Sequence, residues 1–280
     1  MCGCPIGCRF CGAGEFFVRN LTAVEIVSQA VDLLVDGSPR LGLGDPSALQ
    51  IRLDRMGEPT LNRALAPALL ALAHWFPQAS LLICTSAPRV PWDWLFELGR
   101  QLPQLDVQFS LHESTDDVRN ERIRFRRKFS LREIADLGAA WRDNTGRRVG
   151  FNYCAHAHNV SDDDADRLAE RFDPQTWTAT VSVIFDTAGA SLDGLAHPAM
   201  VTETFSRKLR ARGFSTEVFH PQGAGVLGAG PGQLWHVQRW ARSNAGRLRR
   251  RTGLAALRQD DPKVGPRESK EISAALPCSI

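Results

Sequence analysis

Six short runs typical of β-strands alternate with amphipathic runs typical of α-helices over most of this chain. The first are rich in β-branched and aromatic residues, and the second repeat apolar residues with a helical period. This alternation predicts a parallel sheet covered by helices, built either as an open doubly wound sheet or as a barrel related to the eight-stranded one. The predicted strands are residues 49–53, 80–86, 105–113, 147–154, 178–186 and 215–220, and the predicted helices are residues 22–36, 62–76, 92–102, 130–144, 163–172 and 200–213.

Polar motifs stand at the C-terminal ends of four of these strands, and their places favour the barrel. They are MGEP at 56–59, TSAP at 85–88, SLHE at 110–113 and HN at 158–159. Barrels of this class build their sites at the C-terminal ends of the strands. An open sheet usually carries a glycine-rich phosphate loop, and GLGDP at 42–46 is a poor match because no helix follows it. We therefore expect a barrel.

Length and composition suit a chain with a full hydrophobic core. Of 280 residues, 43% are hydrophobic and 23% are charged, which is enough for one large domain or two small ones. The sequence contains no apolar run of about 18 residues, and its first residues lack the basic and apolar regions of a signal peptide. We therefore expect a cytoplasmic protein without a membrane partner.

The C-terminal part differs in charge from the rest of the chain. Between Trp235 and Thr252 there are six arginines and no acidic residue, and a mixed-charge stretch with three prolines follows. This pattern predicts a core domain at residues 1–234 and a basic helix with a disordered end at residues 235–280. A solvated helix is the simpler interpretation of the arginines, and contact with RNA is the alternative.

Four of the seven cysteines stand within the first eleven residues, at Cys2, Cys4, Cys8 and Cys11. Seven are too few for a disulfide scaffold at this length, so the grouping indicates metal chemistry in a reducing compartment. The spacing of the last three lets them hold one iron–sulfur cluster while one iron stays open to chelate a cofactor. The alternative is a structural zinc site in which Cys2 completes four sulfurs.

Further motifs accompany the cysteines in a fixed order. Phe10 precedes the last cysteine, and Gly12-Ala13-Gly14 and Arg19-Asn20-Leu21-Thr22 follow it. MGEPTLN stands at 56–62, SLHEST at 110–115, TGRRV at 145–149 and PGQL at 231–234. Over roughly residues 2–250, the chain thereby resembles the radical S-adenosylmethionine (radical SAM) superfamily, and within it the RNA adenine methyltransferases of the RlmN/Cfr type. The resemblance implies an α/β fold, the partial TIM-type (β/α)6 barrel of radical SAM enzymes.

The resemblance also implies a [4Fe-4S] cluster held by Cys4, Cys8 and Cys11, whose open iron binds the amino and carboxylate groups of SAM. One electron from an external flavodoxin- or ferredoxin-type donor then cleaves SAM to methionine and a 5′-deoxyadenosyl radical. The residues implied to contact SAM are Phe10, Gly57, Glu58, Cys84, Ser110, Leu111, His112 and Asn159. Cys84 departs from the family, which has a serine there, and exchanges a good hydrogen-bond donor for a weak one.

Several of these residues have simpler structural interpretations. Glu58 can cap the helix that follows it, and His112 can be a buried structural histidine. Cys84 and Cys154 lie in predicted strands, where a thiol usually packs as a small hydrophobic side chain. The two histidines at 156–158 suggest a metal site, but a polar loop is the simpler interpretation because no cysteine or carboxylate stands at a matching spacing.

The chain departs from the RNA methyltransferases at positions that carry their chemistry. Those enzymes use a methyl-carrying cysteine just before Gly-Gln-Leu, where this chain has Pro231 and therefore no thiol. Cys278 is a doubtful substitute, and RFRRKF at 124–129 replaces a Pro-Ile-Asn segment. The family's RNA-binding domain, its acidic base and its upstream cysteine have no counterpart. Only three residues precede Cys4, so we expect the first barrel strand to be missing or degenerate, and a shortened chain is the favoured explanation.

We therefore expect a radical SAM enzyme of unknown substrate whose reaction begins with hydrogen abstraction. One alternative is a ribosomal or transfer RNA adenine C-methyltransferase that uses another thiol. The other is a non-catalytic module, stabilised by zinc or binding RNA, that kept the fold and lost the chemistry.

Overall fold

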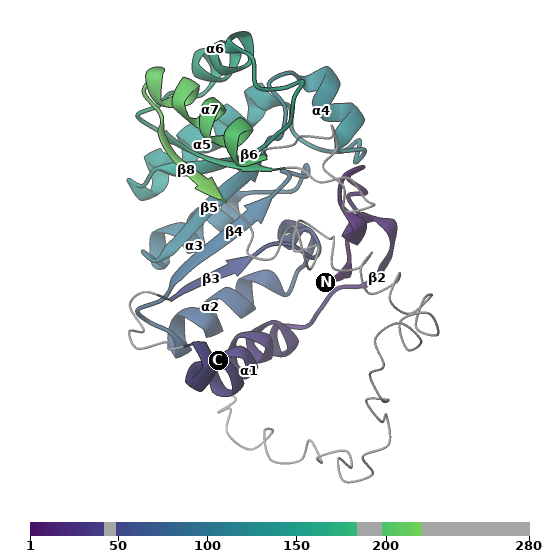
Figure 1. Cartoon of the computed structure of the whole chain (residues 1–280). Helices are drawn as coiled ribbons and strands as arrows, with labels where there is room; N and C mark the ends of the chain where they lie inside the picture. Colours follow the sequence, from purple (N-terminus) through teal and green to yellow (C-terminus); the bar gives the residue numbers. More distant parts are fainter. Residues whose placement is uncertain (42–48, 184–197, 220–280) are drawn as a thin grey trace, which may run out of the picture. The chain divides into compact units, whose positions relative to one another are not determined.

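Six parallel strands form one sheet whose order follows the chain. They are β3 (Gln50–Leu53), β4 (Ser80–Thr85), β5 (Leu105–Ser110), β6 (Val149–Ala155), β7 (Trp177–Val183) and β8 (Ser215–Phe219). The computed structural model describes residues 1–41, 49–183 and 198–219, all within one compact unit, Met1–Gln238. The sheet curls into a half barrel, so the predicted partial (β/α)6 barrel is confirmed (Figure 1).

Helices alternate with these strands. Within the described ranges they are α1 (Ala23–Leu41), α2 (Leu65–Trp75), α3 (Asp93–Gln101), α4 (Asp116–Arg122), α5 (Leu131–Thr145), α6 (Asp162–Arg171) and α7 (Pro198–Ala211). Ser130 and Ser161 each begin a helix with a capping box, and α5 ends at Gly146 in the left-handed conformation. The sequence pattern does not predict α4, because a helix of 7 residues shows too little apolar periodicity. None of the described helices is both long and apolar enough to cross a membrane.

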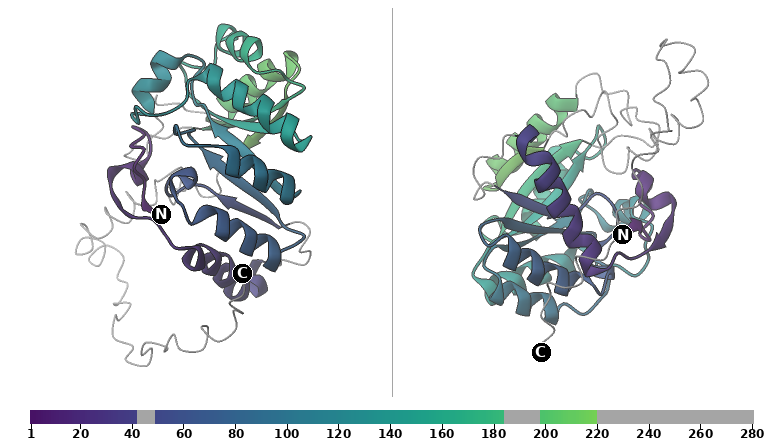
Figure 2. Two further views of the ribbon diagram at one scale, coloured as in Figure 1. Left: turned by 180° about the vertical axis from the view of Figure 1, so that it is seen from behind. Right: turned by 90° about the horizontal axis from the view of Figure 1, so that it is seen from below.

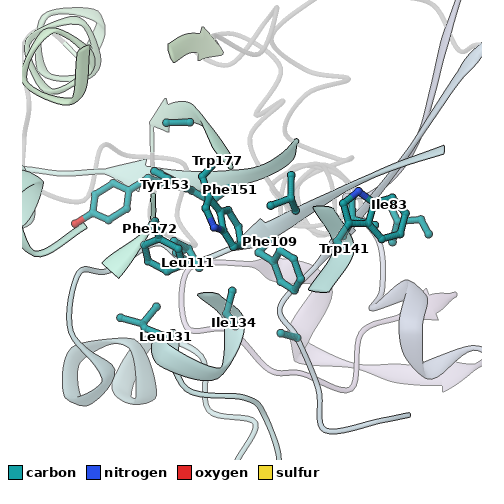
Figure 3. Close-up of a cluster of buried hydrophobic side chains, with 14 of the residues drawn as sticks. Ile83, Phe109, Leu111, Leu131, Ile134, Trp141, Phe151, Tyr153, Phe172 and Trp177 are labelled. Carbon is teal, nitrogen blue, oxygen red and sulfur yellow. The ribbon is translucent and has the colours of Figure 1, made fainter. Parts of the chain in front are cut away.

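The two faces of the sheet differ in character, because successive side chains along a strand point to opposite sides. The outer face carries the buried core beneath the helices (Figure 3), including Ile83, Val107, Phe109, Phe151, Tyr153 and Trp177. The inner face carries polar side chains instead, among them Arg52, Cys84, Gln108, Asn152 and Ser182. Since barrel interiors are usually filled with branched apolar residues, a polar inner face indicates a binding surface.

Helix α5 packs unusually close to the sheet at Gly138. A Cβ atom at this position would lie 1.9 Å from Cζ2 of Trp177, a ring that is 1% exposed. Only glycine permits this approach, so the glycine inside the helical pattern serves packing.

Three loops leave the sheet through left-handed residues that are not glycine. Arg55 follows β3 with φ 67°, Ala87 follows β4 with φ 60° and His112 follows β5 with φ 66°. The left-handed conformation of His112 explains why β5 ends at Ser110, although the sequence pattern predicts a strand to Glu113. Left-handed backbone at ordinary residues is strained and is commonly found at functional sites.

The N-terminal residues form a small hairpin on the inner side of the sheet (Figure 2). Its strands are β1 (Cys2–Gly3) and β2 (Phe17–Arg19), which pair antiparallel and enclose the short helix η1 (Gly12–Glu15). Among the described residues, the first strand of the six-stranded sheet is β3, and the residues ahead of Cys4 pair with β2 instead.

Several predictions fall outside the described residues. They concern Pro231, Cys278, the arginines after Trp235 and the tail at residues 235–280. The boundary between a core at residues 1–234 and a separate tail therefore stays a prediction.

Candidate functional site

A pocket of about 160 Å³ lies on the inner face, at the C-terminal ends of the strands. The N-terminal loop and every strand of the sheet, or the loop after it, contribute to its lining. Nine of the predicted site residues line it, namely Cys4, Cys8, Phe10, Cys11, Gly57, Glu58, Cys84, Ser110 and His112. The other two, Leu111 and Asn159, do not. The structure thus gathers residues that are far apart in sequence into one site.

Main-chain hydrogen bonds shape the loop that carries the three cysteines. The amide of Cys4 donates to the carbonyl oxygens of Ala13 (2.8 Å) and Phe16 (2.9 Å), which closes the loop at its base. The amide of Cys11 donates to the carbonyl of Cys8 at 3.2 Å. At Gly14, a Cβ atom would lie 2.8 Å from Cα of Gly7, so the two turns need glycine to pack against one another.

The three thiols line one pocket and are partly buried. Burial raises the pKa of Cys4 to about 11 and that of Cys8 well above its usual range, and nearby Cys11 and Cys4 raise the pKa of Cys8 further. Burial raises the pKa of Cys11 as well. A bound metal reverses this tendency, because its positive charge stabilises thiolates.

These cysteines fit an iron–sulfur cluster. Within the described ranges, no three His, Cys, Asp or Glu side chains lie close enough to share a single metal ion. A cluster does not need such convergence, because each thiolate binds a different iron atom. The shared pocket and the glycine-shaped loop are compatible with three thiolates that hold one cluster.

Glu58 lines the same pocket, and its carboxylate accepts several hydrogen bonds. It accepts from the Thr85 hydroxyl at 2.6 Å, from the Ser86 hydroxyl at 2.7 Å and from the Ser86 amide at 2.8 Å. It also accepts from the amide and hydroxyl of Thr60, and so caps the short helix η3 (Pro59–Leu61). Glu58 therefore caps a helix and lines the pocket at once. Ser86 of the motif TSAP also lines the pocket, although it is not among the predicted site residues.

His112 presents a neutral imidazole to the pocket. Burial lowers its pKa to about 3, and the charges of Arg119 and Arg122 act in the same direction. Its Nδ1 atom is buried and has no hydrogen-bond partner among the described residues. Its ring meets that of Phe10 edge to face at 5.1 Å, and Phe10 in turn packs against Cys154.

Asn159 lies behind this wall of the pocket. Its side-chain amide donates to the carbonyls of His112 (2.9 Å) and Cys154 (3.0 Å), and its oxygen accepts from the His156 amide at 2.7 Å. Leu111 is fully buried in the hydrophobic core. Both residues therefore fix the main chain around His112 instead of reaching the pocket.

A hydrogen-bonded group on the inner face forms a further part of the lining. Arg52 pairs with Asp54 at 3.0 Å and donates to Gln108 at 3.3 Å, and the Cys84 thiol lies 3.6 Å from the same Gln108 oxygen. Burial raises the pKa of Cys84 to about 12, so this thiol stays protonated. Of these residues, only Cys84 is predicted from the sequence to contact SAM. The period-two alternation within each strand is the signal that would have found the others.

Arg119, on α4, is a fully buried cation beneath the pocket. Its guanidinium donates to the carbonyls of Ser86 and Phe129, both at 2.9 Å, and to that of Ser110 at 3.4 Å. Burial lowers its pKa to about 10, which leaves it charged at neutral pH. It therefore ties together the loops that follow β4 and β5 and the segment after α4.

A second buried ionic group lies beside the cysteine loop. Glu113 accepts from Arg122 at 2.7 Å and from His156 at 3.0 Å. The carbonyl of Arg122 accepts from the amide of Arg9, which stands between two of the cysteines. His156 therefore pairs with a carboxylate that is distant in sequence, which spacing along the chain does not reveal.

Comparison with known proteins gives consistent relatives. No family model matches the sequence. Proteins named probable dual-specificity RNA methyltransferase RlmN are 30% identical in Kocuria rhizophila, over 81% of this chain and 62% of the relative, and 27% identical in Moorella thermoacetica, over 85% and 67%. The RlmN protein of Thermotoga neapolitana is 30% identical over 60% of this chain and 48% of its own length. The chain thus spans between about half and two thirds of the curated relatives it matches.

The solved structures agree. A radical SAM methyltransferase from Sphaerobacter thermophilus has a TM-score of 0.66 and 25% identity, over 82% of this chain and 67% of its own. SuiB of Streptococcus suis, solved with bound S-adenosylmethionine, has a TM-score of 0.56 over 81% of this chain and 48% of its own, and at 14% identity supports the fold alone. The comparisons confirm the resemblance that the motifs predict.

Proposed function

From its resemblance to radical SAM methyltransferases of the RlmN type, we propose that this chain binds a [4Fe-4S] cluster through Cys4, Cys8 and Cys11 and binds SAM beside it. The observation that carries the proposal is the single pocket into which these three cysteines and the residues after β3, β4 and β5 converge. When bound and reduced, the cluster supplies the electron that cleaves SAM to a 5′-deoxyadenosyl radical. The substrate that this radical attacks is open.

The pocket residues supply binding and orientation. Gly57 and Glu58 receive the methionine end of SAM, where a carboxylate suits an ammonium group. The hydroxyls of Thr85 and Ser86 hold that carboxylate in place.

The part of the pocket lined by Phe10, Ser110 and His112 receives the adenosine part of SAM. Phe10 packs against the adenine, and Ser110 and His112 line the wall beside it. Leu111 and Asn159 contribute through the main chain of this loop, because Asn159 holds the His112 carbonyl.

Anaerobic reconstitution with iron and sulfide tests the proposal. The expected result is a brown protein with about four irons that forms 5′-deoxyadenosine from SAM when dithionite is added. Cys8→Ser is expected to lose both properties. Cys2→Ser is the matched control and is expected to keep them, because Cys2 does not line the pocket. A colourless protein whose bound zinc is lost in Cys2→Ser contradicts the proposal and favours the zinc-stabilised, non-catalytic module.

A second candidate function is methyl transfer to an adenine carbon of ribosomal or transfer RNA. The names of the relatives favour it. Pro231, which lies outside the described residues, stands against it because proline cannot carry a methyl group. Transfer of labelled methyl from SAM to adenine in RNA tests this candidate. If it occurs, unchanged transfer in Cys278→Ala excludes Cys278 as the replacement thiol.

The reaction needs partners that follow from the same proposal. A flavodoxin- or ferredoxin-type protein donates the electron, and the arginine-rich tail is a candidate contact for RNA phosphates. A cytoplasmic location fits reduced cysteines and an oxygen-sensitive cluster.

A further inference from the structure

A strongly basic segment runs beside the cysteine loop. Residues 122–129, which we call the strap, contain five cations and no acidic residue. Such charge runs are usually solvated and mobile, but the contacts of the strap show a defined main chain.

The strap is fixed to two loops of the site. At its start, the amide of Arg9 donates to the carbonyl of Arg122 at 2.9 Å, and Cys8 forms an isolated bridge with Ile123. At its end, the amide of Arg89 donates to the carbonyl of Arg127 at 2.8 Å, and that of Phe129 donates to Ala87 at 2.9 Å. The strap therefore spans from the cysteine loop to the loop after β4.

The cations of the strap divide into two groups. Arg122 pairs with Glu113, and the buried Lys128 donates to the Phe125 carbonyl at 3.1 Å. Arg124, Arg126 and Arg127 are exposed, as is the neighbouring Arg9 of the cysteine loop. Among the described residues, none of these four forms an ion pair. We call them the basic collar.

Fixed, exposed and uncompensated arginines form a surface for an acidic partner. A rigid main chain lowers the entropy lost on docking, and clustered charge of one sign accelerates encounter with a partner of opposite charge. The position of the collar limits which partner it suits. Arg9 stands between two cluster ligands in sequence, and Ile123 of the strap lines the pocket with its fully buried side chain.

We propose that the basic collar docks a small acidic one-electron carrier protein. The inference rests on the proposed function, which requires such a donor. Electron transfer needs the two redox centres to come close, and the collar lies beside the loop that carries the cluster ligands. The reduced carrier loses one electron, and the oxidised cluster gains it. RNA phosphates are the competing partner, and the place of the collar beside the cluster ligands favours the carrier.

The test compares two reductants on two variants with the same charge change. The collar variant is Arg124→Gln, Arg126→Gln and Arg127→Gln, which keeps all cluster ligands. The control variant is Arg171→Gln, Arg207→Gln and Arg210→Gln on α6 and α7, where these arginines are also exposed. Cluster reduction is followed by stopped-flow absorbance with photoreduced flavodoxin and, separately, with dithionite. Binding of oxidised flavodoxin to the metal-free chain is titrated in parallel.

In the collar variant, reduction by flavodoxin at low salt is expected to be roughly tenfold slower and flavodoxin binding correspondingly weaker. Dithionite is small and needs no docking surface, so its rate is expected to be unchanged. The control variant is expected to match the wild-type chain with both reductants. Equal flavodoxin rates in the two variants overturn the inference. So does a collar variant that loses only its affinity for an RNA oligonucleotide.

Failure of the proposed function is distinguishable from failure of the docking inference. A wild-type chain that assembles no cluster contradicts the proposed function, and the titration with the metal-free chain then decides the docking. Binding that is lost in the collar variant supports the inference, and binding that is equal in both variants overturns it.

Discussion

At the scale of single residues, His112 shows how the fold fixes the state of a side chain in the site. The imidazole is buried within the influence of two cations, the buried Arg119 and the partly buried Arg122, and no carboxylate pairs with its Nδ1 among the described residues. Protonation would bury an unpaired charge. The ring therefore stays neutral at physiological pH and can pack against Phe10.

This state predicts a loss of stability in acid. The pKa of His112 is about 3 in the folded chain and near 6.5 in the unfolded one. Below pH 6.5 only the unfolded chain takes up the proton, so stability falls as the pH decreases toward 3. By pH 5 the loss amounts to about 2 kcal/mol. Urea unfolding of the metal-free chain at pH 7 and pH 5 measures it. His112→Gln is expected to remove this part of the loss, whereas His74→Gln, at an exposed histidine, is expected to keep it. Equal pH dependence of stability in both variants would show that His112 does not cause the loss in acid.

At the scale of elements, α4 and its buried Arg119 organise the loops around the pocket. A helix of 7 residues is too short to be stable alone, so its value lies in what it positions. Arg119 satisfies carbonyls that belong to the loop after β4, the end of β5 and the strap. These three segments would otherwise bury unpaired carbonyl groups.

Arg119→Met is therefore expected to destabilise the chain by about 3 kcal/mol, because at least two buried carbonyls lose their donor. Urea unfolding measures the change. Arg100→Met removes an exposed arginine of similar size and is expected to cost less than about 1 kcal/mol. A loss no larger in Arg119→Met than in Arg100→Met would show that water replaces these bonds.

How much of these elements the sequence predicts depends on the distance over which each contact forms. The six strands and, except for α4, the helices between them follow from local periodicity, and the cysteine loop follows from its motif. The contact of Glu58 with Ser86 does not follow from local periodicity. Ser86 stands directly after β4, the next strand of the sheet, and meets Glu58 only when the sheet forms. The pairing of Glu113 with Arg122 and His156 is hidden for the same reason. Periodicity assigns side chains to a face, but only closure of the sheet shows which of them meet.

At the scale of the whole molecule, the cysteine loop is joined to the sheet mainly through Phe10, which packs against His112 and Cys154. Its hydrogen bonds run mainly within the hairpin, and its links to the strap are those of Cys8 and Arg9. Segments with few buried contacts open at lower free energy than the core. In the metal-free chain this loop is therefore expected to open without unfolding of the sheet.

Hydrogen exchange tests this expectation. In the metal-free chain, the amides of Cys4, Cys11 and Gly14 are expected to exchange faster than those of β4 and β5, although they are hydrogen-bonded. Reconstitution with iron and sulfide is expected to slow them, because bound metal adds its binding free energy to the closed loop. Cys8→Ser treated in the same way is expected to show no slowing. Exchange at the rate of the strands before reconstitution would instead show a loop that is preformed and rigid.

The left-handed residues Arg55, Ala87 and His112 fix the course of the loops that follow β3, β4 and β5. Each holds a conformation that costs about 1 kcal/mol and that glycine adopts freely. Replacing Ala87 by glycine would relieve strain in the folded chain, but it would also give the unfolded chain more freedom and the loop more ways to move. Substitutions at these three positions that aim at thermal stability would therefore make the loops around the pocket less ordered. Stabilising substitutions are better placed on the outer helices.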